Sequence, residues 1–532
     1  MPAEADMQDV RSGRLRSAKP TAPTSTAVRL HRVPEWLVAR TVALFAGANF
    51  RLAAMVAAAG LAGGVMFGFA HRAMLDDSMI TLSYARTLAE HGQWGMVKGL
   101  TSNSATSVLN VLLLAAIIVV IGHPVVAVGI LLMTTMAAMA WWGTRIAEDA
   151  RLPIRAFPAA VVGLLLVNPI LISTIGLETY LGTALVVGVA RYALAGRPTS
   201  TGVITGLVAL ARPDLIVFAS VIILGLSPGR RRLGRSAVTA VAVTLPWYAF
   251  SWWVLGSAIP DTFVFKTVVN HFDSGDTFLD GPMMWARFFP AASLVGWLPA
   301  LAGVACLLGW AAAAARRRWS AAGTLAVVFS LGGIAHFGVF ATLGTPPYQW
   351  YYGPVVAGLT LCLTTTAMVL PWRRLVYGTF AAGVALTVAF EVHNGLSWTT
   401  TPISSNWATT AQYAAAASGV AAATSGARAV GSPGEIGALA FYCDCRIVDL
   451  FSDRGDAANW IEERMRRAGP LMRRLLELNY HNLDRHPALH RDSQLSFEPA
   501  GQGSGLARWP ISSPVHGPHT LVLRGADGVP KG

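Results

Sequence analysis

Residues 52–78 read LAAMVAAAGLAGGVMFGFAHRAMLDDS, an apolar run from Leu52 to Ala70 that is closely followed by two adjacent acids, Asp76 and Asp77. About 20 apolar residues are enough to cross the hydrocarbon core of a bilayer as a helix. Similar runs recur up to residue 392, which is more than one buried helix of a soluble protein would explain. The stretch therefore predicts the first of several transmembrane helices, with an acidic loop where that helix leaves the membrane. Further examples are Pro124–Gly143, Ala237–Leu255, Ala291–Ala311 and Ala321–Thr342.

The composition of the whole chain agrees with a membrane protein. Of its 532 residues, 54% are hydrophobic and 13% are charged, whereas soluble chains carry about 25% charged residues. The net charge of +13 would also fit a nucleic-acid partner. However, the basic residues stand in short clusters between apolar segments, which is the pattern that orients membrane proteins. We therefore exclude nucleic acid as a partner and expect a multi-pass protein of the plasma (inner) membrane that contacts membrane lipid.

The arginine clusters predict which helix ends are cytoplasmic, because positively charged loops tend to stay inside. If all clusters lie inside, the chain makes about 11 crossings, and residues 107–121 lie along the membrane or dip into it. Arg212-Pro213-Asp214 is expected to divide 201–227 into two short helices, since Pro disfavours a helical conformation at the preceding residue. The clusters are Arg40 and Arg51; Arg145, Arg151 and Arg155; Arg191 and Arg197; Arg230, Arg231, Arg232 and Arg235; Arg316, Arg317 and Arg318; and Arg373 and Arg374. The expected crossings are 52–70, 124–143, 156–173, 179–195, 200–211, 214–227, 237–255, 291–311, 320–342, 354–371 and 374–392.

This arrangement predicts a mostly α-helical protein in three parts. Residues 1–50 form a basic tail on the cytoplasmic side, and 51–392 form a polytopic bundle of transmembrane helices. Residues 393–532 form a small soluble α/β domain on the extracytoplasmic side, where the polar loops of the bundle also lie.

Two features of the polar C-terminal part carry their own predictions. The alternating apolar run Gly434–Leu450 is typical of a strand, and Asp456–Tyr480 is expected to be a helix. Cys443 and Cys445 are expected to be unlinked thiols, with a disulfide or a metal site as the alternatives.

The first outer loop opens with Asp76 and Asp77 and continues as an amphipathic helix. One helix cap would explain one Asp but not two in a row. A carboxylate here could be a general base that activates a hydroxyl nucleophile, and the pair could bind a divalent cation. Asn103 and Ser104, at the end of the same loop, could bind sugar hydroxyls or could simply cap the next helix.

Two cations on the outer side are candidate phosphate ligands. Arg212 could bind a phosphate through its planar guanidinium, and a charged residue at membrane depth is a functional candidate by default. A structural ion pair of Arg212 with Asp214 or Glu178 is an equally good explanation. Lys266 could be a second phosphate contact or an interfacial lysine whose stem lies in the lipid.

The last outer loop, Pro346–Tyr352, reads PPYQWYY. Aromatic residues are enriched at membrane interfaces in general, but this density beside two prolines exceeds what an interfacial belt needs. Aromatic rings also suit stacking on the faces of sugars. His336 lies inside an apolar segment and is not a candidate, because such histidines are more often packed than ligating. The candidate substrate contacts of this loop are Tyr348, Gln349, Trp350, Tyr351 and Tyr352.

In this order, the motifs resemble those of the type C (GT-C) membrane glycosyltransferases, which use polyprenyl-phosphate sugars. The resemblance is to the branch that contains the terminal β-arabinofuranosyltransferase of the mycobacterial cell wall, although the loop Tyr348–Tyr352 departs from the pattern of the arabinosyl enzymes. It covers roughly residues 50–400. The matching stretches are Asp76-Asp77-Ser78, Ser102–Thr106, Gly176-Leu177-Glu178-Thr179, Arg212-Pro213-Asp214 and Pro260-Asp261-Thr262 with Lys266.

The resemblance implies a GT-C fold with amphipathic helices in the first outer loop. It also implies inverting transfer of a sugar, arabinofuranose or mannose, from a polyprenyl-phosphate donor to an envelope glycan, lipid or protein. Asp77 would then be the base, and Asp76 would orient the acceptor or bind a cation, while Arg212 and Lys266 would bind the donor phosphate. The other substrate contacts would include Asn103, Ser104, Glu178 and Asp214.

No nucleotide-binding motif argues for a bound nucleotide, and no metal ligand set is assigned. The alternative function is a transporter or flippase of lipid-linked sugars, for which paired broken helices and inverted repeats would be typical.

Overall fold

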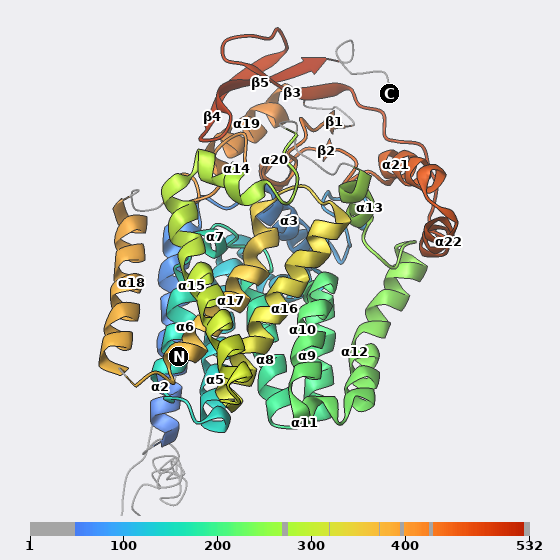
Figure 1. Cartoon of the computed structure of the whole chain (residues 1–532). Helices are drawn as coiled ribbons and strands as arrows, with labels where there is room; N and C mark the ends of the chain where they lie inside the picture. The colour runs from blue at the N-terminus through green and yellow to red at the C-terminus, as the bar shows by residue number, and fades with distance from the viewer. Residues whose placement is uncertain are drawn as a thin grey trace, which may run out of the picture. The chain divides into compact units, whose positions relative to one another are not determined.

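The computed structural model describes residues 48–268, 275–318, 320–371, 373–393, 398–424 and 429–525. Nearly all of the predicted N-terminal tail lies outside these ranges. Residues Leu52–Gly532 form one compact unit, in which long helices run side by side (Figure 1). Five helices are long and apolar enough to cross a membrane. They are α2 (Ala48–Ala70), α5 (Pro124–Ala150), α12 (Leu233–Val254), α15 (Pro290–Ala315) and α16 (Ala321–Leu343).

Shorter apolar helices complete the bundle, so the prediction of about 11 crossings stays a prediction. Most of these helices have 10–17 residues, fewer than the 20 or so that one straight crossing needs. The segment 107–121 is one of them and forms α4. They are α4 (Val108–Ile121), α6 (Ala156–Leu166), α8 (Thr179–Leu194), α9 (Pro198–Ala211), α10 (Ile216–Gly225), α17 (Gly353–Ala367) and α18 (Arg373–His393).

The predicted break at Arg212 is confirmed. Helix α9 ends at Ala211, and Arg212 has an extended backbone, with φ −157° and ψ 114°. A single 3₁₀ turn, η1 (Pro213–Leu215), then leads into α10. The proline that follows Arg212 disfavours the helical conformation there, which places the Arg212 side chain between the ends of two short helices.

Small elements near the predicted outer loops carry most of the candidate residues. The amphipathic helix expected after Asp76 is present as α3. These elements are α3 (Asp76–His91), α7 (Pro169–Ile172), α13 (Asp261–Val268), α14 (Gly281–Phe288) and the 3₁₀ turn η2 (Gln349–Tyr352), while α11 (Ser227–Arg230) lies at the opposite end of the helices (Figure 1).

The C-terminal part contains helices and one mixed five-stranded sheet in the order β2-β1-β3-β5-β4. Strand β1 pairs parallel to β2 and β3, whereas β5 pairs antiparallel to β3 and β4. The helices are α19 (Thr410–Ala423), α20 (Gly437–Tyr442), α21 (Arg454–Arg467) and α22 (Pro470–Asn479), and the strands are β1 (Val430–Gly431), β2 (Ile447–Val448), β3 (Ser493–Pro499), β4 (Ala507–Ser513) and β5 (Gly517–Gly525).

Two expectations for this part were wrong. The run Gly434–Leu450 is not one strand, because its first half forms helix α20 and only Ile447–Val448 pair in the sheet. The physical reason is tertiary: backbone N–H groups at the start of α20 bind the carboxylate of Asp76. The expected helix Asp456–Tyr480 is divided at Gly469 into α21 and α22, since Pro470 can begin a helix but cannot continue one.

Candidate active site

The first half of the candidate site surrounds Lys266 on α13. Its ammonium nitrogen lies 3.8 Å from Oδ1 of Asp77 at the start of α3. The same nitrogen lies 4.6 Å from the ring centre of Tyr348, 5.4 Å from that of Trp350 and 5.6 Å from that of Tyr351. Cation–π attraction and the charge of Asp77 therefore hold Lys266 against the aromatic loop. Three predicted stretches that are far apart in the sequence meet at this lysine.

The second half surrounds Arg212, whose side chain is only 6% exposed. One Nη lies 3.4 Å from Oε1 of Glu178, the other lies 3.0 Å from Oδ2 of Asp214, and Nε donates to both Asp214 oxygens. The structural pairing considered from the sequence is therefore present with both acids. The guanidinium carbon also lies 5.4 Å from the ring centre of Tyr351.

Tyr351 joins these two halves, since its ring contacts both Lys266 and Arg212. We call Arg212 and Lys266 the cation pair. The guanidinium of Arg212 lies near two carboxylates, and the ammonium of Lys266 lies near one. The two side chains come from different elements and contact the same ring. Two neighbouring cations of this kind can bind different oxygens of one phosphate group.

His336 is a residue that the sequence reasoning missed. It is fully buried in α16, and its Nε2 lies 2.5 Å from Oδ2 of Asp214. Its ring is stacked on Phe340, which also lies under the Arg212 guanidinium. The available signal was the rule that an ionisable residue inside an apolar segment deserves a functional hypothesis.

Asp76 and Asp77 are neighbours in sequence but have different surroundings. Asp76 is 4% exposed, and its two oxygens accept hydrogen bonds from the backbone N–H of Gly437 (2.9 Å) and Ala438 (2.7 Å). A side chain at Gly437 would not fit, because a Cβ there would lie 2.0 Å from the carbonyl oxygen of Asp76. Burial raises the pKa of Asp76 to about 6, although these hydrogen bonds partly oppose the rise. Asp76 thus joins α3 to α20, whereas Asp77 is about one-third exposed and faces Lys266.

The turn before α8 brings Glu178 to the site. Gly176 adopts φ 93°, a left-handed conformation that favours glycine. The turn is held from two sides, because Ser78 Oγ donates to the carbonyl of Ile175 and Asn110 Nδ2 donates to that of Gly176. The Gly-Leu-Glu-Thr stretch is therefore fixed against α3 and α4.

Asn103 and Ser104 lie apart from the cation pair and bind neighbouring loops. Asn103 Nδ2 donates to Ser257 O and Oγ, both at 2.9 Å, and to Ser251 Oγ at 3.0 Å. Ser104 Oγ donates to the carbonyl of Phe451 in the C-terminal part. Both side chains are buried. The hydrogen bonds of Asn103 and Ser104 to protein groups fix the first outer loop. A sugar could contact either side chain only if it replaced these hydrogen bonds.

The remaining aromatic-loop candidates, Gln349 and Tyr352, are also buried. Tyr352 stacks on Phe278 and donates its hydroxyl to the carbonyl of that residue at 2.6 Å. Gln349 Nε2 is 3.5 Å from the carbonyl of Ile403, and its Oε1 has no hydrogen-bond partner among the described residues. Tyr352 therefore anchors the loop, while Tyr348, Trp350 and Tyr351 surround Lys266.

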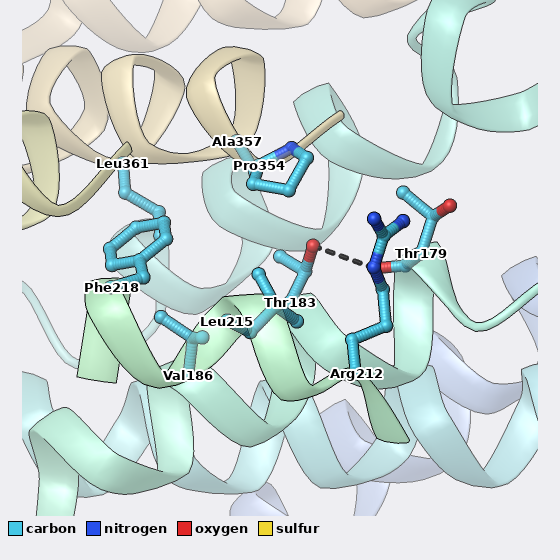
Figure 2. A pocket seen from close by; sticks show the side chains of 9 residues that line it. All are labelled: Thr179, Thr183, Val186, Arg212, Leu215, Phe218, Pro354, Ala357 and Leu361. Atoms are coloured by element: carbon cyan, nitrogen blue, oxygen red, sulfur yellow. Dashed lines mark hydrogen bonds between the residues drawn. The ribbon is translucent and has the colours of Figure 1, made fainter. Parts of the chain in front are cut away.

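A narrow, mostly apolar pocket runs from Arg212 between α8, α10 and α17. Figure 2 shows Arg212 and Thr179 at one end of this pocket, and Phe218 and Leu361 at the other. The lining changes from polar at Arg212 to apolar at Phe218, and the enclosed volume of about 10 Å³ has room for about one water molecule. The other lining residues are Thr183, Val186, Leu215, Pro354 and Ala357.

The geometry also bears on the divalent cation that Asp76 and Asp77 could have bound. The carboxylate oxygens of Asp76 accept hydrogen bonds from backbone N–H groups, and Asp77 faces the ammonium of Lys266. Within the described ranges, no group of three or more His, Cys, Asp or Glu side chains could hold a metal ion. The arrangement at Asp77 therefore suits Lys266 better than a metal.

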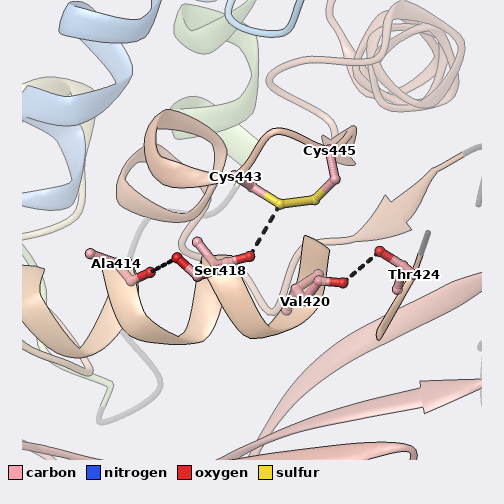
Figure 3. Close-up of a disulfide and its surroundings, with 7 residues drawn as sticks. Ala414, Ser418, Val420, Thr424, Cys443 and Cys445 are labelled. Atoms are coloured by element: carbon pink, nitrogen blue, oxygen red, sulfur yellow. Dashed lines mark hydrogen bonds between the residues drawn. A yellow bond between two sulfur atoms is a disulfide. The ribbon is translucent and has the colours of Figure 1, made fainter. Parts of the chain in front are cut away.

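The expectation of unlinked thiols was wrong, since Cys443 and Cys445 form a disulfide (Figure 3). Helix α20 ends at Tyr442, and Cys443 is extended, so the chain turns through Asp444 and brings the two Cα atoms to 5.0 Å. This separation lies within the range of about 4.4–6.8 Å that a disulfide requires. Cys443 Sγ also lies 3.4 Å from the carbonyl of Ala417 on α19. The bond closes the loop directly after the helix that binds Asp76.

A second buried ion pair, outside the cation pair, supports a prediction about pH. Asp261 on α13 is 2% exposed; its Oδ2 lies 3.7 Å from Arg454 and its Oδ1 accepts from Ser257 Oγ. Burial raises the pKa of Asp261 to about 6 even though Arg454 and Ser257 oppose the rise. Between the unfolded and the folded pKa, the folded state binds more protons, so stability falls as pH rises.

We therefore expect the melting temperature to fall from pH 5 to pH 8, with Asp261 contributing roughly 1 kcal/mol of the lost stability. The Asp261→Asn variant should show a shallower slope, whatever its melting temperature at one pH. Scanning fluorimetry of both proteins in the same detergent measures this, and equal slopes would contradict the assignment.

A scan of protein-family models and a search of curated proteins found no match. A search of solved structures found ArnT from Cupriavidus metallidurans in its apo state, with a TM-score of 0.56 and 14% identity over 90% of this chain and 99% of ArnT. The chain has the fold of ArnT. This likeness confirms the fold alone, and the number of crossings stays a prediction.

Two further similar structures lie below a TM-score of 0.5. ArnT bound to undecaprenyl phosphate gives 0.48 at 12% identity, over 90% of this chain and 99% of ArnT. The mycobacterial arabinofuranosyltransferase AftD gives 0.45 at 14% identity, over 91% of this chain and 40% of AftD. At identities this low, a likeness concerns the fold alone, so the activity must be argued from the site.

Proposed function

We propose that this chain is a membrane glycosyltransferase that moves a sugar from a polyprenyl-phosphate donor to an envelope glycan, lipid or protein, with inversion. The observation that carries the proposal is the cation pair, whose two members contact the ring of Tyr351, together with the carboxylate of Asp77 beside Lys266. ArnT has been crystallised bound to undecaprenyl phosphate, and we extend this ligand class to the present chain. Arabinofuranose and mannose are the sugars that we would test first.

In the proposed reaction, the acceptor hydroxyl oxygen bonds to the anomeric carbon as the bond from that carbon to the phosphate oxygen breaks. Asp77 takes the hydroxyl proton, and the polyprenyl phosphate leaves with the bonding electron pair. The leaving group is already anionic, so it needs charge stabilisation more than a proton. Arg212 and Lys266 supply this stabilisation from fixed positions.

The side of the membrane is also part of the proposal. Helix α11, which contains Arg230, lies at the end of the bundle opposite to the C-terminal sheet (Figure 1). Positively charged loops tend to remain cytoplasmic. We therefore place the candidate site and residues 393–532 on the extracytoplasmic side.

The test uses the purified full-length protein with synthetic polyprenyl-phosphate arabinofuranose and mannose and a panel of envelope acceptors. We expect a new glycosidic bond, with inverted anomeric configuration by NMR, from one donor. Movement of labelled donor across vesicles without any new bond would indicate a flippase and would overturn the proposal.

A further inference from the structure

Helix α22 carries a row of exposed apolar side chains that the protein itself does not cover. Leu471 is 74% exposed, Leu475 is 53% exposed and Leu478 is 63% exposed. These positions are spaced by four and three residues, so they share one face of the helix. Met472, which is 40% exposed, extends the same face. Several large apolar side chains on one short exposed helix indicate that something other than water covers them.

The opposite sides of α22 have other roles. Leu476 is buried and packs with Ile461 of α21 and with Val264 and Phe265 of α13. Arg473 and Glu477 form an exposed ion pair at 2.9 Å. The exposed apolar row is therefore a third face, distinct from the face that packs on the protein and from the polar face.

The C-terminal end of α22 is fixed to the end of a candidate membrane helix. Trp252 Nε1 near the end of α12 donates to the carbonyl of Leu478 at 2.8 Å, and Asn482 Nδ2 donates back to the carbonyl of Trp252. The backbone N–H of Ile259 donates to Asn479 Oδ1. Helix α12 spans 22 residues, and only 6% of its apolar window is buried inside the protein, as expected of a membrane helix that meets lipid outside its contact with α9. Figure 1 shows α22 beside the same end of α12.

Exposed apolar side chains also lie at the end of α12. Trp253 is 75% exposed and Val254 is 65% exposed at the end of α12, directly after the tryptophan that binds α22. Tryptophan at a helix end is typical of the membrane–water interface. The region 461–480 contains five arginines and three glutamates, a net charge of +2, which suits anionic lipid headgroups.

We infer that α22 is an interfacial helix that lies in the outer leaflet, with Leu471, Leu475 and Leu478 among the acyl chains. The amphipathic pattern, the hydrogen bonds to the end of α12 and the basic surroundings all favour lipid as the occupant. Through Leu476, this contact also supports α13, the helix that carries Lys266. The inference depends on α12 crossing the membrane and on the membrane side proposed above, and it does not depend on sugar transfer.

The test places a fluorescent label on opposite faces of α22 in the full-length protein. Leu475→Cys and Glu477→Cys are made in a background with Cys306→Ala and Cys362→Ala, labelled with an environment-sensitive dye without reductant. The proteins are reconstituted in phosphatidylcholine–phosphatidylglycerol vesicles that contain a lipid with a nitroxide near the headgroup. Both positions are exposed, so size-exclusion profiles should match that of the parent.

We expect the label at 475 to emit at shorter wavelength and to be quenched by the nitroxide lipid, while the label at 477 is quenched by aqueous iodide. Equal access of iodide to both labels would overturn the inference. A label at 475 that is shielded from iodide but not quenched by the lipid would also overturn it, because a second protein surface would then cover the helix.

Discussion

Replacing Asp77 by asparagine is expected to lower the rate of sugar transfer by about 10²–10⁴-fold, the usual contribution of a general base. The change keeps the size of the side chain but removes its negative charge, and with it both the ability to take a proton and the ion pair with Lys266. Asp77 suits this role because it is partly exposed and one of its oxygens lies 3.8 Å from Lys266. Steady-state transfer with a saturating donor measures the effect.

The neighbouring Asp76→Asn variant is the matched control. Its carboxylate accepts two backbone hydrogen bonds from the start of α20, so we expect it to lower the melting temperature more than Asp77→Asn does. If Asp77→Asn transferred sugar at the wild-type rate, the assignment of the base would be wrong. If Asp76→Asn alone lost transfer without losing stability, the two roles would have to be exchanged.

The second large effect is expected at Arg212. Removing one charged donor from a developing anion typically lowers kcat by about 10²–10³-fold. Arg212→Ala would also leave Glu178 and Asp214 without their shared cation, and breaking a buried pair costs about 3–5 kcal/mol. That variant could fail to fold, so Arg212→Lys is the informative one. Lysine keeps the charge but loses the planar fork that serves Asp214 and Glu178 together.

Arg454→Lys provides a control of the same chemistry outside the cation pair, because Arg454 is also buried and pairs with Asp261. We expect both lysine variants to lower the melting temperature, and only Arg212→Lys to lower kcat. Equal losses of kcat would mean that Arg212 acts through stability alone.

Local sequence rules predicted those features that depend on neighbouring residues. Proline after Arg212 interrupted the helix as expected, and the amphipathic pattern after Asp76 formed α3. The same rules failed for Gly434–Leu450, where alternation suggested a strand. The first half of the segment instead forms helix α20. The carboxylate of Asp76, which is distant in the sequence, accepts hydrogen bonds from the N–H groups at the start of that helix. The sequence did not reveal the role of His336, because its partner, Asp214, lies 122 positions away.

The sequence by itself determined that this is a membrane protein and which residue types lie at its polar loops, since the length and charge of each segment decide its cost in lipid. Only the tertiary structure decided that Lys266 and Arg212 both contact the ring of Tyr351, and that Asp76 and Asp77 have different surroundings. Contacts between residues so far apart depend on how the helices pack, and no local pattern carries that information.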